Sequence, residues 1–136
     1  MTRPNDLSAT EARKLIGNKQ LSPLELTKSC IDQVERYNPS INAVVAINHE
    51  DVLKEAKKAE DDVMAGKELG LLHGLPVGIK DLNPVKDLRS TSGSKLFENR
   101  IPDYDDSVVA DIRAEGGIVF CKTNTPEFGA GANTKN

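Results

Sequence analysis

Residues 106–121 read DSVVADIRAEGGIVFC, a short amphipathic segment followed by two glycines and an apolar run. The first part predicts a helix capped by Asp105 or Asp106, because a side-chain oxygen there can accept the free N–H groups of the first turn. Its buried side is expected to use Val108, Val109 and Ile112. The glycine pair ends the helix, and residues 118–121 predict a strand buried on both faces. Helix, glycines and apolar strand in this order are typical of a layered α/β fold with helices covering a sheet.

The first third of the chain predicts helices with clear starting signals. Ser8-Ala9-Thr10-Glu11 fits a capping box, and Ser22-Pro23-Leu24-Glu25 offers an N-cap serine, a proline at the first helical position and a glutamate at the third. We expect the second helix to end at Asn38-Pro39. Asn48 is expected to cap a third helix that runs from about His49 to Ala65.

Two further segments predict strands. Ala43–Ile47 is a continuous apolar run of the kind found in buried strands, and a second strand is centred on residues 77–80. Lys95–Glu98 favours a short helix. About three strands are therefore expected, and the chain has no internal repeat or linker, so residues 1–136 belong to one domain.

Composition excludes several classes of function. Charged residues make up 29% of the 136 residues and the net charge is −3, which gives no electrostatic basis for binding nucleic acid. No apolar run approaches the length of a membrane span, and Met1–Asp6 lacks the apolar core of a signal peptide. Cys30 and Cys121 are expected to be buried free thiols, which favours the cytoplasm. With two histidines and no paired-ligand spacing, neither a metal site nor a cofactor is expected.

Residues 74–81, GLPVGIKD, place a lysine at the end of a short apolar strand. Burying the Lys80 ammonium without a partner would be costly. A desolvated lysine loses its proton readily and can act as a base. Alternatively, the side chain reaches solvent or pairs with Asp81.

Three downstream segments, together with residues 74–81, carry a family resemblance. They are Thr91–Lys95 (TSGSK), Asp105–Val109 (DDSVV) and Lys122–Phe128 (KTNTPEF), in this order. From about Ser8 to Asn136 the chain resembles the amino-terminal part of the amidase signature family. The resemblance implies an α/β fold with a mixed sheet covered by helices, and a single amidase domain that continues beyond residue 136.

The same resemblance implies a Ser–cis-Ser–Lys amide hydrolase in which Lys80 is the catalytic lysine. Lys80 would take a proton from the cis-serine, which in turn serves the nucleophilic serine. The family's Gly-Gly-Ser-Ser-Gly-Gly segment, which carries the nucleophile and the oxyanion hole, does not occur in these 136 residues. No serine of the chain matches the nucleophile, and the cis-serine is also expected after Asn136. The 136 residues alone are therefore expected to be inactive.

Four other residues are weaker candidates. Thr91, Ser92 and Ser94 match a family element and can hydrogen-bond near the lysine, although ordinary turn chemistry around Gly93 explains them equally well. Phe128 is a candidate substrate contact, because the corresponding loop lines the acyl pocket in related amidases; the alternative is that Phe128 belongs to the core.

Two alternatives concern Asp81. We interpret it as structural, bonding to the backbone of the loop that follows. A thiol hydrolase triad of Cys121, His73 and Asp81 is disfavoured, because Cys121 lies in an apolar strand with no group to stabilise a thiolate.

The expected function is hydrolysis of a small-molecule carboxylic amide, without metal or cofactor and without a nucleic-acid or membrane partner; a homodimer is possible. The alternative from another class is an inactive scaffold or interaction module. An amidotransferase A-type subunit fits less well, because Asp81-Leu82 stands where those subunits have Lys-Asp-Asn. The chain also departs from the family as a whole, since Lys86-Asp87-Leu88 replaces the small residues often found in that loop.

Overall fold

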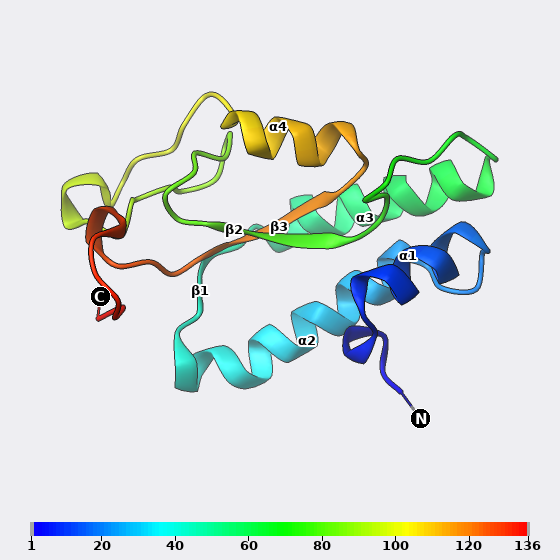
Figure 1. Cartoon of the computed structure of the whole chain (residues 1–136), viewed down its shortest axis with the longest axis horizontal. Helices are drawn as coiled ribbons and strands as arrows, with labels where there is room; N and C mark the ends of the chain where they lie inside the picture. Colours follow the sequence, from blue (N-terminus) through cyan, green and yellow to red (C-terminus); the bar gives the residue numbers. More distant parts are fainter. Residues whose placement is uncertain (1, 136) are drawn as a thin grey trace.

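The computed structural model describes residues 2–135, and over this range the strands form one three-stranded sheet (Figure 1). The strands are β1 (Val44–Ala46), β2 (Pro76–Lys80) and β3 (Ile118–Thr123), in the order β1-β3-β2. The central strand β3 is parallel to β2 and antiparallel to β1. The expected mixed sheet is therefore confirmed.

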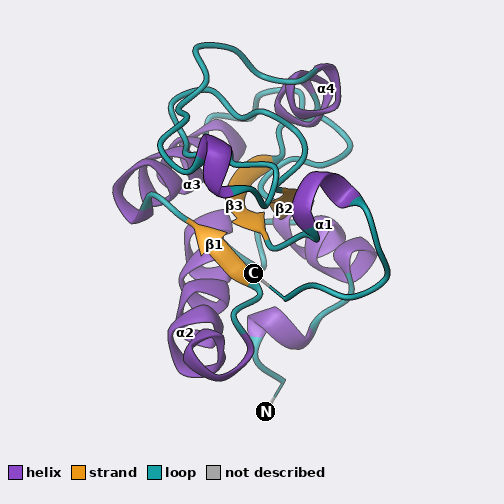
Figure 2. Ribbon diagram, turned by 90° about the vertical axis from the view of Figure 1, so that its left-hand side faces the viewer, coloured by secondary structure: helices purple, strands orange, loops and turns teal. Residues whose placement is uncertain are grey.

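Helices cover both faces of this sheet (Figures 1 and 2). The four α-helices within residues 2–135 are α1 (Ala9–Gly17), α2 (Pro23–Ile41), α3 (His49–Met64) and α4 (Ser107–Ala114). Short 3-10 turns are η1 (Pro4–Asp6), η2 (Lys95–Phe97) and η3 (Glu127–Gly129). None of the helices in the described range combines the length and the apolar character that crossing a bilayer requires.

The core has one apolar layer on each side of β3. On one side, Phe120 and Ile118 pack with Ile31 of α2 and Val52 of α3. On the other side, Val109 of α4 packs with Ile79, Val85 and Val119. A third cluster joins α1 to the start of α2 through Ile16 and Leu26. Strand β3 is buried on both faces, as expected for a central strand, and both apolar layers pack against it.

The predicted helix starts are confirmed by their capping contacts. Ser8 and Glu11 form both halves of the capping box, and Ser22 accepts hydrogen bonds from the first-turn N–H groups of α2. Asn48 caps α3, and Asp106 caps α4. Asp105, the other candidate cap, instead accepts a hydrogen bond from Lys86 N and pairs with Arg113 at 2.9 Å.

Three local expectations were wrong. Helix α2 does not stop at Asn38-Pro39 but continues through Pro39 to Ile41, with the loss of one intrahelical hydrogen bond at the proline; the helix ends where Asn42 adopts a left-handed φ of 48°. Strand β1 is shorter than Ala43–Ile47 and only half-buried, because it is an edge strand. Val108 lies on the solvent side of α4 and is 45% exposed.

A β-bulge in β3 decides which way its side chains point. Val77 pairs with Val119, but the next residue, Gly78, pairs with Cys121, so that β3 contains one extra residue at this point. Phe120 and Cys121 consequently both lie on the α2 and α3 side. Lys122 then pairs with Ile79 and points to the side of α4.

Candidate active site

Lys80 is the last residue of β2, and its side chain is exposed. Alternation along the strand places it on the face opposite to Ile79, which is buried against α4. Gly78 shares the face of Lys80 and is exposed as well, since α2 and α3 cover β3 on this side but not these two residues. Within residues 2–135 Lys80 forms no ion pair. Of the two structural alternatives, the side chain reaches solvent, and pairing with Asp81 is excluded.

Asp81 follows Lys80 directly and is 2% exposed. Its two carboxylate oxygens accept hydrogen bonds from the backbone N–H of Thr91 (3.0 Å) and from Thr91 Oγ1 (2.5 Å). Its own backbone N–H donates to Thr123 O at 2.9 Å, which extends the ladder between β2 and β3. The interpretation of Asp81 as a structural residue that binds the following loop is confirmed.

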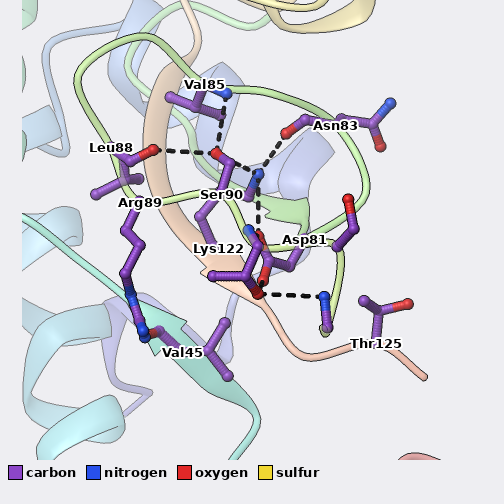
Figure 3. A network of polar contacts seen from close by, with 12 residues as sticks. Val45, Asp81, Asn83, Val85, Leu88, Arg89, Ser90, Lys122 and Thr125 are labelled. Carbon is purple, nitrogen blue, oxygen red and sulfur yellow. Dashed lines mark hydrogen bonds and ion pairs between the residues drawn. The ribbon is translucent and has the colours of Figure 1, made fainter. Parts of the chain in front are cut away.

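The buried ammonium of this region belongs to Lys122, whose side chain is completely inaccessible to solvent (Figure 3). Its Nζ donates to Asn83 O and to Ser90 Oγ (3.0 Å), and it lies 3.4 Å from Asp81 Oδ1. Three N–H groups thus meet three oxygen acceptors. Burial lowers the pKa of Lys122, and the Asp81 carboxylate opposes this by raising it.

The loop between Asp81 and Ser94 is closed around this lysine. Ser90 Oγ donates to Leu88 O and accepts from Val85 N, while Arg100 donates to Ser90 O at 2.7 Å. Figure 3 shows Ser90 between the Val85–Leu88 turn and Lys122. The buried Lys122 ammonium and the hydrogen bonds of Ser90 therefore hold this loop in place.

Thr91, Ser92 and Ser94 lie together, but their contacts are those of a turn. Thr91 Oγ1 accepts from Gly93 N, and Ser92 has a φ of 55°. Ser94 Oγ caps η2 and donates to Glu127 Oε1 at 2.7 Å. They contact Asp81, the η3 loop and Arg100, which donates to Ser92 Oγ at 3.3 Å, and none of these contacts involves Lys80.

Phe128 lies in the same region, because its backbone N–H donates to Ser92 O at 2.8 Å. The ring stands edge-on to Phe97 with centroids 6.1 Å apart, and the residue is 53% exposed. Phe128 is therefore not a core residue. A cleft of about 400 Å³ beside these segments is lined in part by Asp81, Thr91 and Ser94.

The thiol triad does not form. Burial raises the pKa of the Cys121 thiol to about 11. The ring of His73 bonds to Ala59 O, and the Asp81 carboxylate is held by Thr91 and Lys122.

Sequence reasoning missed Lys122, Ser90 and Arg100. A signal for Lys122 was present: it follows the apolar run Ile118–Cys121 in the strand predicted to be buried on both faces. An ammonium at the end of a strand buried on both faces is still more costly to leave without a partner than the Lys80 ammonium.

Comparison with known proteins places these features in a family. The model of the Amidase family matches residues 25–136. The chain is 41% identical over 130 residues to an acylamidase from Rhodococcus erythropolis, covering 96% of this chain and 27% of that protein. It is 36% identical over 128 residues to the A-type subunit of the glutamyl-tRNA(Gln) amidotransferase of Clostridium botulinum (strain Alaska E43 / Type E3), covering 94% of this chain and 26% of the relative.

A solved structure gives the same result. That of a bacterial aryl acylamidase of the amidase signature family superposes with a TM-score of 0.83 at 28% identity, over 90% of this chain and 26% of the other. The chain thus spans about a quarter of the length of the relatives it matches.

Proposed function

Because this chain belongs to the amidase signature family, we propose that it carries the general base, Lys80, of an enzyme that hydrolyses a carboxylic amide. The observation that carries the proposal is the separation of Lys80 from its neighbouring carboxylate. Asp81 is turned to the other face of the sheet and held by Thr91 and Lys122, and Lys80 is exposed beside a glycine. A Cβ at Gly78 would lie 3.0 Å from Thr123 Cγ2, so the glycine allows β2 and β3 to pack closely beside Lys80.

The charge of the base is central to this chemistry. A lysine in water has a pKa of about 10.4, so only about one in a thousand carries the free amine at neutral pH. A free carboxylate next to the amine would reduce that fraction further. The engagement of Asp81 elsewhere supports a role for Lys80 as a base.

The mechanism that we propose follows from the family resemblance. The neutral Lys80 amine accepts a proton from a cis-serine, the cis-serine accepts one from the nucleophilic serine, and the serine oxygen attacks the amide carbonyl. The proton returns to the departing nitrogen, which leaves as ammonia or amine, and water then releases the acid from the acyl-enzyme. Both serines would come from residues outside this chain.

A second candidate is transfer of the released ammonia to an acyl acceptor. The identity of 36% to an A-type component of a glutamyl-tRNA(Gln) amidotransferase favours it. The two functions share the amide-cleaving step and differ in what consumes the ammonia. Release of free ammonia from a simple amide in the absence of any acceptor, at a rate that an acylated tRNA does not raise, supports the hydrolase.

The test is replacement of Lys80 in the complete protein. Lys80→Ala and Lys80→Arg should both abolish release of ammonia from a simple amide, because guanidinium keeps its proton at any working pH. Lys86→Arg, at an exposed lysine of the 81–94 loop, is the matched control and should leave the rate unchanged. Near-normal kcat in Lys80→Arg at neutral pH would show that the residue acts only as a positive charge.

A further inference from the structure

A buried ion pair lies directly behind the proposed base, and the mechanism above makes no use of it. Asp81 directly follows Lys80 in the sequence. Lys122 pairs across the sheet with Ile79, which directly precedes Lys80. The backbone of Asp81 is tied to Thr123 O, so the pair cannot move independently of the end of β2. The pair and Lys80 occupy opposite faces of the same strand end.

Stability alone does not explain charges at this position. Removing two charges from water costs about as much as their attraction returns, and apolar side chains of similar volume often serve as well. The layer around Ile79, Val85 and Val119 is apolar and adjacent. A charge-related role for the pair is therefore the better explanation.

Other charged groups reach the same location from two elements. Arg100, from the loop before α4, lowers the pKa of Lys122, and Asp106, the cap of α4, raises it. These two act in opposite directions. Lys122 itself is the cation in direct contact with the Asp81 carboxylate.

We propose that Lys122 is a positioning and charge-balancing residue for Lys80: it neutralises Asp81 and holds the loop behind the strand end, so that Lys80 can lose its proton. The inference rests on the proposed function of Lys80 as general base. An unbalanced carboxylate one residue away would favour the protonated amine. Lys122 removes that influence through the 3.4 Å pair without approaching the reacting atoms.

The test measures the proton affinity of Lys80 without relying on turnover. Trace acetylation with acetic anhydride is followed from pH 6 to 11 by mass spectrometry of the peptide containing Lys80, since only the free amine reacts. Lys122→Met should move the midpoint for Lys80 upward, because it leaves the Asp81 carboxylate unbalanced. Asp81→Asn should move it downward, and the double variant should return it close to the parent value.

Opposite shifts from the two single variants distinguish charge balance from loosened structure, which would move both in the same direction. Lys57→Met, which removes an exposed lysine paired with Glu60 on α3, is the control and should leave the midpoint unchanged. An unchanged midpoint in Lys122→Met, or an equal shift in Lys122→Met and the double variant, overturns the proposal. If Lys122→Met does not fold, Asp81→Asn decides: a lower midpoint supports the proposal and an unchanged one overturns it.

Turnover provides the second readout. In an active enzyme, the acidic limb of the pH profile of kcat/KM should move with the acetylation midpoint. If the parent protein cleaves no amide, the proposed function fails, while the acetylation result still decides the role of Lys122.

Discussion

Replacing Asp81 by alanine should be among the most damaging single changes in this domain. The substitution leaves the Lys122 ammonium, which is 0% exposed, without its carboxylate. Breaking a buried pair by removing one partner costs about 3–5 kcal/mol. Thr91 also loses two acceptors, so the upper part of that range applies. A domain of this size has about 5–15 kcal/mol of stability in total, so the loss should be severe.

The double variant Asp81→Ala/Lys122→Met should be more stable than Asp81→Ala alone. Methionine fills most of the lysine volume without a charge, and the uncompensated cation disappears. Asn83 O and Ser90 Oγ each lose one donor, which costs about 1 kcal/mol apiece. We expect the second substitution to recover about 2 kcal/mol of the loss.

Urea unfolding at pH 7, followed by circular dichroism for the parent, both single variants and the double variant, measures the coupling between the two residues. The matched control is the exposed pair Lys57–Asp61 at 2.9 Å, where the same cycle should be nearly additive. Additivity within about 0.5 kcal/mol for Asp81 and Lys122 would refute the reasoning. It would show that the ammonium is solvated or repositioned when its partner is removed.

Four further predictions concern other parts of the chain. Burial raises the pKa of the Cys121 thiol from 9.0 to about 11, so the folded state keeps this proton at a pH where the unfolded state has lost it. Unfolding free energy should therefore fall by about 2–3 kcal/mol as the pH rises from about 9 to 11, and Cys121→Ala should flatten this loss in urea titrations. Gly116→Ala should lower the Tm, because φ is +81° and a Cβ would lie 2.7 Å from His73 Nδ1; Gly66→Ala, where φ is +71° but nothing lies within 4 Å, should lower it less. Ser22→Ala should cost about 1 kcal/mol in the same urea assay through loss of the α2 cap, and a smaller loss would mean that water replaces the hydroxyl. Residues 1–136 alone should release no ammonia from a simple amide, and measurable turnover by the pure polypeptide would contradict the assignment of the nucleophile to a segment outside it.

The parts of the fold that could be predicted from sequence are those set by local chemistry. Caps at Ser8, Ser22 and Asn48 depend on one side chain and the next turn of backbone, and all three form as expected. The strand at residues 118–121 could be predicted because a short apolar run that follows a glycine pair is typical of a buried strand. The end of α2 was misplaced because proline was expected to end the helix, whereas Pro39 lies inside it and the helix continues to Ile41.

The candidate site was predictable only in part. Asp81 could be interpreted as structural because its partner, Thr91, lies in the loop that follows. Lys122 is 41 residues from Asp81 in sequence, and its direction depends on the bulge in β3. Simple alternation from Val119 would have placed Lys122 on the α2 and α3 side, away from Asp81.

The extra residue in β3 also sets how the strand tolerates changes in length. Because β3 has one residue more than β2 between Val119 and Cys121, deleting Phe120 would leave a regular ladder. Cys121 would still point toward α2 and α3, and Lys122 would still face Asp81, at the expense of one buried aromatic ring. An insertion at the same point would add a second unpaired residue to β3. The Lys122 ammonium would then turn to the α2 and α3 side of the sheet, which is apolar. This central strand is therefore expected to survive the loss of a codon better than the gain of one.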